Sequence, residues 1–260
     1  ALIGSLTDRY NFGISDVFTS MVIYDGAIYA TGRHIPTFGP IPPLSKMRMG
    51  LSKLDLATGN LVWSRLSHLD TSVVASLRGE DLLIDDNAVL TVCSGLDTTS
   101  ASQVFFMQKT SLDGELLWAK RYSVPGQLYS NAHDILQMSD GYVIIGEVSL
   151  VAGETNVIIV KTNFDGNVLW TKRLASSAVV NVLASQFNSS RHSAVILNDV
   201  LLFTGVTNDA LGDILFLKMT SAGESGDSCA YVESLDLQMS PVPDPVNMPI
   251  QLTITQNIGQ

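Results

Sequence analysis

Two histidines are the residues best placed to do chemistry. His133 and His192 each precede a glycine by the same interval, so they hold equivalent positions in neighbouring copies of a repeat. Imidazoles that face a central channel from two copies could hold a metal ion or a small ligand. The same interval selects Thr19 and Leu82 in the two earlier copies, which would leave such a ring incomplete. The alternative is a repeated loop residue that bonds to the backbone, and we predict neither a metal nor a cofactor.

A proline-rich loop is the best candidate for a recognition surface. Residues 34–50 form a stiff apolar insertion where the other copies have shorter polar links. Proline fixes φ and so lowers the entropy that a loop loses on binding. The alternative is a loop that folds down on its own sheet. The candidate binding residues are Pro36, Phe38, Pro40, Pro42, Pro43, Met47 and Met49.

The sequence motifs typical of catalysis are absent. There is no GxSxG, GxGxxG, P-loop, HExxH or EF-hand pattern. We therefore predict no catalytic residues and no enzyme activity. The alternative is an oxidoreductase or a hydrolase with carboxylates or histidines in a central channel.

Composition excludes several classes of protein. The chain has 260 residues and a net charge of −10, with 15% charged and 46% hydrophobic residues. A disordered chain would be more polar, and a nucleic-acid binder would need a basic face. No apolar stretch is long enough to span a bilayer, and the first residues lack the layout of a signal peptide. Cys93 and Cys229 form no CxxC pair. The sequence leaves two alternatives for them, a disulfide or two buried thiols.

An internal repeat organises the chain. Residues 51–67, 107–123 and 159–175 share a lysine, a turn with Asp and Gly, a tryptophan and a closing basic residue. A degenerate fourth copy at 216–232 has Cys229 and Tyr231 near the tryptophan position. We expect the tryptophans to be structural and to cover the edge of the adjoining copy. All three tryptophans of the protein occupy this one position: Trp63, Trp118 and Trp170.

The strand pattern predicts a β-propeller of four-stranded antiparallel blades. A strand–turn–strand signal precedes each copy, which gives four strands per repeat. The runs 103–109, 156–162, 199–205 and 213–219 are continuously apolar, so both of their faces should be buried. No amphipathic helix is available to cover them. Radial repetition of small sheets buries both faces of every blade.

The boundaries place four blades between two end segments. In one picture the two ends pair and complete a fifth blade; in the other, further blades lie upstream of this sequence. The segments are 1–12, the tail of a preceding blade; 13–67, 68–123 and 124–175, three blades; 176–234, a degenerate blade; and 235–260, a Pro-rich link with a terminal strand.

The repeat resembles a known family. The pattern at 140–172, D-G-Y-x-I-x-G followed by K-x-x-x-D-G-x-x-x-W-x-K, resembles the delta-sixty or SBBP-type repeats of secreted and cell-surface proteins of Bacteroidetes-like bacteria. Residues 54–63, LDLATGNLVW, resemble the tryptophan-docking motif of quinoprotein-like propellers, although one copy alone has this form. The sequence has no vicinal cysteine pair of the kind that quinoprotein dehydrogenases use.

The resemblance implies secretion, with the type IX route and its gliding motility and adhesion machinery as the corresponding export system. We therefore expect an extracellular, non-enzymatic binding or structural module that presents rim loops to a protein or glycan partner. We expect neither a nucleic-acid partner nor a membrane span, and the remainder of a larger chain or assembly is a further candidate partner.

Overall fold

The protein is all-β. No helix occurs among the residues that the computed structural model describes, and no sheet there closes on itself. The described residues are 9–11, 15–35, 47–68, 74–174, 194–206, 214–225, 232–242, 246–249 and 253–255.

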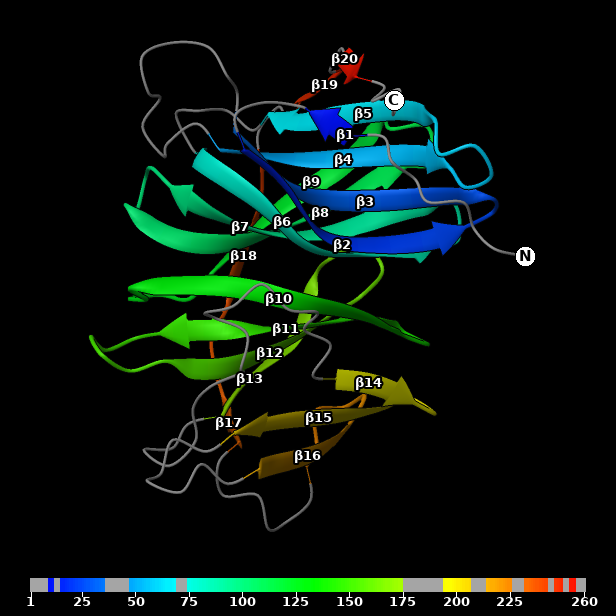
Figure 1. Cartoon of the computed structure of the whole chain (residues 1–260). Coiled ribbons are helices and arrows are strands. Elements are labelled where there is room, and N and C mark those ends of the chain that lie inside the picture. Colours follow the sequence, from blue (N-terminus) through cyan, green and yellow to red (C-terminus); the bar gives the residue numbers. More distant parts are fainter. Residues whose placement is uncertain are drawn as a thin grey trace.

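Most strands belong to antiparallel meanders, which we number units 1 to 4 in chain order (Figure 1). Unit 1 contains β2 (Ser15–Tyr24), β3 (Ala27–Ile35), β4 (Arg48–Asp55) and β5 (Leu61–His68). Unit 2 contains β6 (Val74–Asp85), β7 (Ala88–Asp97), β8 (Ser102–Ser111) and β9 (Leu116–Ser123). Unit 3 contains β10 (Tyr129–Met138), β11 (Gly141–Ser149), β12 (Asn156–Thr162) and β13 (Val168–Leu174). The described strands of unit 4 are β14 (Ala194–Leu197), β15 (Val200–Val206) and β16 (Ile214–Thr220).

The turn between the third and fourth strands is built alike in units 2 and 3, and recurs after β16. Its glycine has a positive φ, between 75° and 86°, at Gly114, Gly166 and Gly223. The amide of that glycine donates to the carbonyl of the residue three positions earlier. A side chain with a β-carbon rarely adopts this φ, which explains why each copy of the repeat carries a glycine here.

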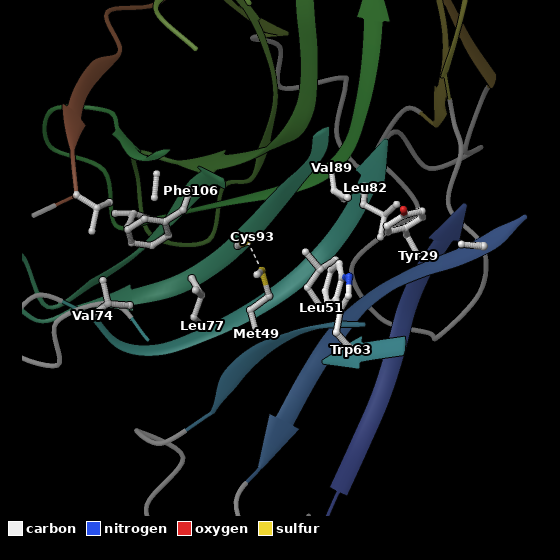
Figure 2. Packing of buried hydrophobic residues seen from close by; sticks show 14 residues of the cluster. Tyr29, Met49, Leu51, Trp63, Val74, Leu77, Leu82, Val89, Cys93 and Phe106 are labelled. Carbon is white, nitrogen blue, oxygen red and sulfur yellow. Dashed lines mark hydrogen bonds between the residues drawn. The ribbon is translucent and has the colours of Figure 1, made fainter. Parts of the chain in front are cut away.

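Three hydrophobic cores lie between successive units in the described part of the chain. The strands in the middle of the array contribute to two cores at once, because alternate side chains point to opposite faces. On β8, Phe106 packs into the core shared with unit 1, whereas Phe105 and Met107 pack into the core shared with unit 3. Figure 2 shows the first core, in which Trp63 and Tyr29 of unit 1 meet side chains of unit 2.

The prediction of strands buried on both faces is confirmed for units 2 and 3. Every residue of β11 and of β12 is buried. It is wrong for unit 4, where Leu217 and Met219 are buried but Phe216 is 63% exposed. Unit 4 has a neighbouring unit on one side among the described residues, so its apolar run is covered on that side alone.

The C-terminal strands run back along the array and add one strand to the outer edge of each earlier unit. β17 (Val232–Ser234) pairs with β13, β18 (Gln238–Pro241) with β9, and β19 (Val246–Pro249) with β5. β20 (Thr253–Thr255) then pairs with β1 (Arg9–Asn11). In Figure 1 this orange-to-red series passes from the end of unit 3 toward unit 1. We call β17–β20 the strap.

The strap corrects two of the predicted boundaries. Residues 232–234 belong to the edge of unit 3 rather than to a fourth blade, and 235–260 is more than a link with one strand. The strap also contributes to the cores, since Val232, Leu237 and Val242 each pack into a different one. The pairing of the two end segments, which the first picture of a fifth blade required, is present as the β1–β20 ladder.

Two further features bear on the sequence predictions. Cys93 is a free, fully buried thiol whose Sγ lies 3.0 Å from Sδ of Met49, and Cys229 lies outside the described residues. Burial, and then the charge of Glu80, raise the pKa of this thiol well above its usual value. In the described ranges, no helix has the length and apolar character needed to cross a membrane.

Candidate functional site

A β-bulge recurs in the first strand of units 1, 2 and 3. The bulges fall between Phe18 and Ser20, between Gly79 and Asp81, and between Ala132 and Asp134. A bulge leaves one extra residue unpaired and turns its side chain away from the ordinary alternation. The residues at the bulges are therefore equivalent: Thr19, Glu80 and His133.

A glycine on the second strand allows the first strand to approach closely. In units 1 and 3 it pairs with the residue before the bulge, whereas Gly95 of unit 2 pairs with Leu77, two residues before Gly79 at the bulge. A β-carbon on Gly146 would lie 2.1 Å from the carbonyl oxygen of Asn131, far inside contact distance. The same carbon would lie 1.9 Å from the Val17 oxygen at Gly32, and 2.5 Å from the Ser76 oxygen at Gly95. The glycine that closes the second apolar run of these repeats thus allows the first strand to approach.

His133 lies buried in unit 3 and faces a carboxylate. Its Nε2 is 3.7 Å from Oε1 of Glu147, and its side chain is 2% exposed. Neither ring nitrogen makes a hydrogen bond. The Nδ2 group of Asn131 donates to the same Glu147 oxygen at 2.8 Å. The imidazole therefore lies beside a carboxylate that a second side chain already holds in place.

Glu80, on the bulge of unit 2, is the second carboxylate of this cluster. Its side chain is 4% exposed and lies 2.5 Å from the guanidinium of Arg78. Burial raises the pKa of Glu80, and the charges of Arg78 and His133 oppose that effect without cancelling it. A carboxyl with a raised pKa holds its proton at a higher pH than a solvated one does.

Asp81, next to the bulge, joins three units. Its Oδ1 accepts from the hydroxyl of Ser20 in unit 1 at 2.6 Å, and its Oδ2 accepts from the amide of Ile135 in unit 3 at 3.0 Å. The carboxylate is 4% exposed. Both of its oxygens are thus used to fix the first strands of neighbouring units to one another.

The side chains of this cluster, Glu80, His133 and Glu147, are too deeply buried for a substrate to reach them. Their exposed fractions are 4%, 2% and 8%. Within the described ranges no set of three or more His, Cys, Asp or Glu side chains is placed to hold a metal ion.

The structure describes one of the two histidine candidates. His133 lies in the first strand of its unit, where it is buried at a bulge and does not face an open channel. His192 lies outside the described residues. Thr19 is the equivalent residue in unit 1, as the spacing predicted. In unit 2 the equivalent is Glu80, so the prediction of Leu82 is wrong, because the position equivalent to Gly146 is held by Cys93 and Gly95 lies two residues further along the strand.

The structure describes two of the seven candidate binding residues of the proline-rich loop. Met49 lies in β4 and is fully buried, so its prediction as a binding residue is wrong. Met47 is half-buried, and its carbonyl accepts from the amide of Leu77 in unit 2 at 2.9 Å. The other five candidates lie outside the described residues: Pro36, Phe38, Pro40, Pro42 and Pro43.

The tryptophans contact the next unit along the chain. Trp63 donates from Nε1 to the carbonyl of Leu112 at 3.0 Å, and Trp170 donates to the carbonyl of Ser221 at 2.8 Å. Both acceptors stand two residues before the glycine of the turn. At the remaining junction, a β-carbon on Gly166 would lie 2.9 Å from Cη2 of Trp118. The predicted structural position of the three tryptophans therefore corresponds to a repeated inter-unit contact.

Sequence reasoning missed the carboxylates of the cluster. The sequence patterns do not single out Glu80, Asp81 or Glu147, yet all three are buried. The signal that could have found two of them is adjacency to glycine: Glu80 follows Gly79 at a bulge, and Glu147 follows Gly146 opposite one.

No protein-family model matches the chain, and no curated protein matches it significantly.

Proposed function

We propose that the chain is a non-enzymatic binding or structural module in which the four units are blades of a β-propeller. The observation that carries the proposal is the contact repeated from unit to unit. A tryptophan on the fourth strand of one unit lies against the glycine turn of the next, with the same hydrogen bond at Trp63 and at Trp170. Identical contacts between successive copies imply a constant rotation from one copy to the next, which is how a propeller is built.

The buried carboxylates support a scaffold rather than a catalyst. Asp85 of unit 2 accepts from Tyr142 and, at 3.1 Å, from Gln137, both in unit 3. It also forms an ion pair of 2.9 Å with Lys109. Together with Asp81, it uses its oxygens to hold units in register. A general acid or base must instead be within reach of a substrate proton.

The proposed setting is outside the cell, with a protein or a glycan as partner. This part of the proposal rests on the resemblance of the repeat at 140–172 to secreted and cell-surface repeats, and on the acidic composition. A rigid array that carries loops at the ends of its strands suits recognition, because binding residues are commonly found on loops that a scaffold positions. Adhesion or gliding machinery exported by type IX secretion is the corresponding assembly.

The function is tested by binding to intact cell surfaces. Fluorescently labelled protein is added to cells of the source organism and to arrays of surface glycans, and bound label is measured. A variant with Pro36, Phe38, Pro40, Pro42 and Pro43 changed to serine is compared with one in which Thr98, Thr99, Ser100 and Ala101 of another exposed turn are changed to glycine. We expect binding by the wild type that the loop variant alone loses. Equal binding by all three proteins, or none by the wild type, would contradict the proposal.

A further inference from the structure

The repeated lysine of the third strand shows which residues of different units are equivalent. It pairs with a residue of the second strand in every unit, and in unit 4 this pair is Lys218 with Leu202. Phe216 stands two positions before its lysine, as do three residues of the earlier units: Leu51, Met107 and Ile159. Those three side chains are fully buried, each in a different core between units. Phe216, in contrast, is 63% exposed.

A position on the first strand gives the same contrast. Val195 pairs with Leu202, and both lie on the face of Phe216, because residues paired across an antiparallel sheet share a face. Val195 is 56% exposed. The equivalent residue of each earlier unit packs against a core between units: Val22, Leu83 and Leu136. The outward face of unit 4 thus carries, uncovered, the side chains with which each earlier unit contacts the next.

The residue types of this outward face favour a covered surface. A strand that faces water on one side usually alternates apolar and polar residues. β15 and β16 are apolar on both faces, since Leu202 and Phe216 point outward while Phe203 and Leu217 pack into the core shared with unit 3. Lys218 is the one charged residue of β14, β15 and β16. In the described part of the chain no core includes a residue of this face, and an exposed apolar surface of this kind commonly marks an interaction site.

The other end of the array does not offer a matching open surface. The row of unit 1 that points away from unit 2 runs from Met21 through Ala30 and Ser52 to Ser64. The last three of these residues are 4%, 1% and 2% exposed, so most of that row is already covered. Unit 4, which forms the opposite end of the array in Figure 1, therefore has the open end face among the described units.

We propose that the outward face of unit 4 binds the same face of a second copy of this chain. Each junction within the array is a contact between two apolar sheet faces. The equivalents of Val195 and Phe216 form one side of every such junction, so an apolar sheet face is the surface that these residues contact in this fold. A second copy supplies such a face, and it is uncovered.

A contact of one patch with itself closes at two chains, unlike a head-to-tail contact, which extends into rings or filaments. The self-association does not depend on whether the module binds a glycan or a protein. The cell-binding experiment above and the experiment below can therefore fail separately.

The test is sedimentation velocity of the full chain over a roughly hundredfold range of concentration. We expect the wild-type mass to rise from the 28.0 kDa of one chain to twice that value and no further. Phe216→Lys and Val195→Lys place a charge in the contact, and each should raise the dissociation constant of the dimer at least about tenfold. The controls Leu117→Lys and Leu169→Lys change side chains that are 53% and 54% exposed within units 2 and 3, and should behave as wild type.

Mixing a variant with the wild type tests the symmetry of the contact. Fluorescently labelled Phe216→Lys, followed in an excess of unlabelled wild type, should keep the mass of one chain at concentrations at which labelled wild type forms the dimer. In a head-to-tail contact the variant would retain a second, unchanged face and would still bind. Circular dichroism confirms that each variant is folded, and Leu197→Lys, on the same face and 59% exposed in the wild type, replaces one that is not.

Four results would overturn the proposal. They are a wild-type chain that stays at 28.0 kDa at every concentration, a mass that rises beyond the dimer, dimerisation of the charged variants with the wild-type dissociation constant, and binding of labelled Phe216→Lys to the wild type as strongly as the wild type binds itself.

Discussion

The contact of Trp63 with unit 2 should contribute several kcal/mol to the stability of the array. The side chain is 9% exposed, its ring lies edge-on to Tyr29 with centroids 6.2 Å apart, and its Nε1 donates to Leu112. Replacing a buried tryptophan by alanine costs about 3–5 kcal/mol through lost contacts and the cavity left behind. We expect Trp63→Ala to lower the free energy of unfolding by that amount.

Trp63→Phe separates the hydrogen bond from the packing. Phenylalanine retains most of the apolar ring but has no N–H, so the Leu112 carbonyl would keep only the Lys53 ammonium, at 3.4 Å. A hydrogen bond of this kind contributes about 0.5–1.5 kcal/mol, and the smaller ring loses some contact. The expected loss is about 1–2 kcal/mol.

The assay is urea unfolding followed by far-ultraviolet circular dichroism, with the slope m checked for constancy across variants. Leu117→Ala is the matched control, because its side chain is 53% exposed and should change stability by less than about 0.5 kcal/mol. A loss below about 1 kcal/mol for Trp63→Ala, or the same loss for the control, would refute the role assigned to the inter-unit contact.

Three other predictions concern the bulges and the buried carboxyls. Gly146→Ala should destabilise the folded protein by at least about 2 kcal/mol, because the added β-carbon would meet the Asn131 carbonyl. Gly50→Ala should be close to neutral, because nothing lies within 4 Å of its added β-carbon. Thermal unfolding compares the two variants. The free energy of unfolding of Glu80→Gln relative to wild type should increase as the pH rises from below the usual pKa of a glutamate through the raised pKa of Glu80. The reason is that ionising this buried carboxyl penalises the folded wild-type protein. A difference in stability that stays constant with pH contradicts this prediction. Asp85→Asn should show the opposite trend in the same urea titrations. Hydrogen bonds and the Lys109 charge outweigh burial and lower the pKa of Asp85, so its stabilising effect is present above the usual pKa of an aspartate and is lost as the pH falls through the lowered value. A loss for Asp85→Asn that is as large in acid as at neutral pH contradicts this reasoning.

The periodic features of the fold could be predicted from the sequence. The run at 156–162 has no polar alternation, and β12 is buried on both faces. The tryptophans share one position in the repeat and one kind of contact in the structure. These predictions succeed because each copy meets the same neighbours, so a local pattern carries the information about packing.

The strap could not be predicted in this way. Its strands are three or four residues long and contain Pro241 and Pro249, residues typical of a link. Proline lacks the amide donor of a sheet but is tolerated at a strand edge, and both prolines end their strands on the outermost edge of a unit. Glu80 was missed for a different reason, because Gly95, from which the interval was counted in unit 2, lies two residues beyond Cys93, the position that pairs beside the bulge.

The strap has a consequence for how the molecule is completed during synthesis. The ribosome releases β17–β20 after all of the strands whose edges they cover, so β13, β9 and β5 carry open backbone donors and acceptors until the strap has been made. A nascent chain halted before Val232 would keep these three edges open to pairing with other chains and would be exposed to quality-control proteases. The strap therefore closes the three edges only after all of the units have been synthesised.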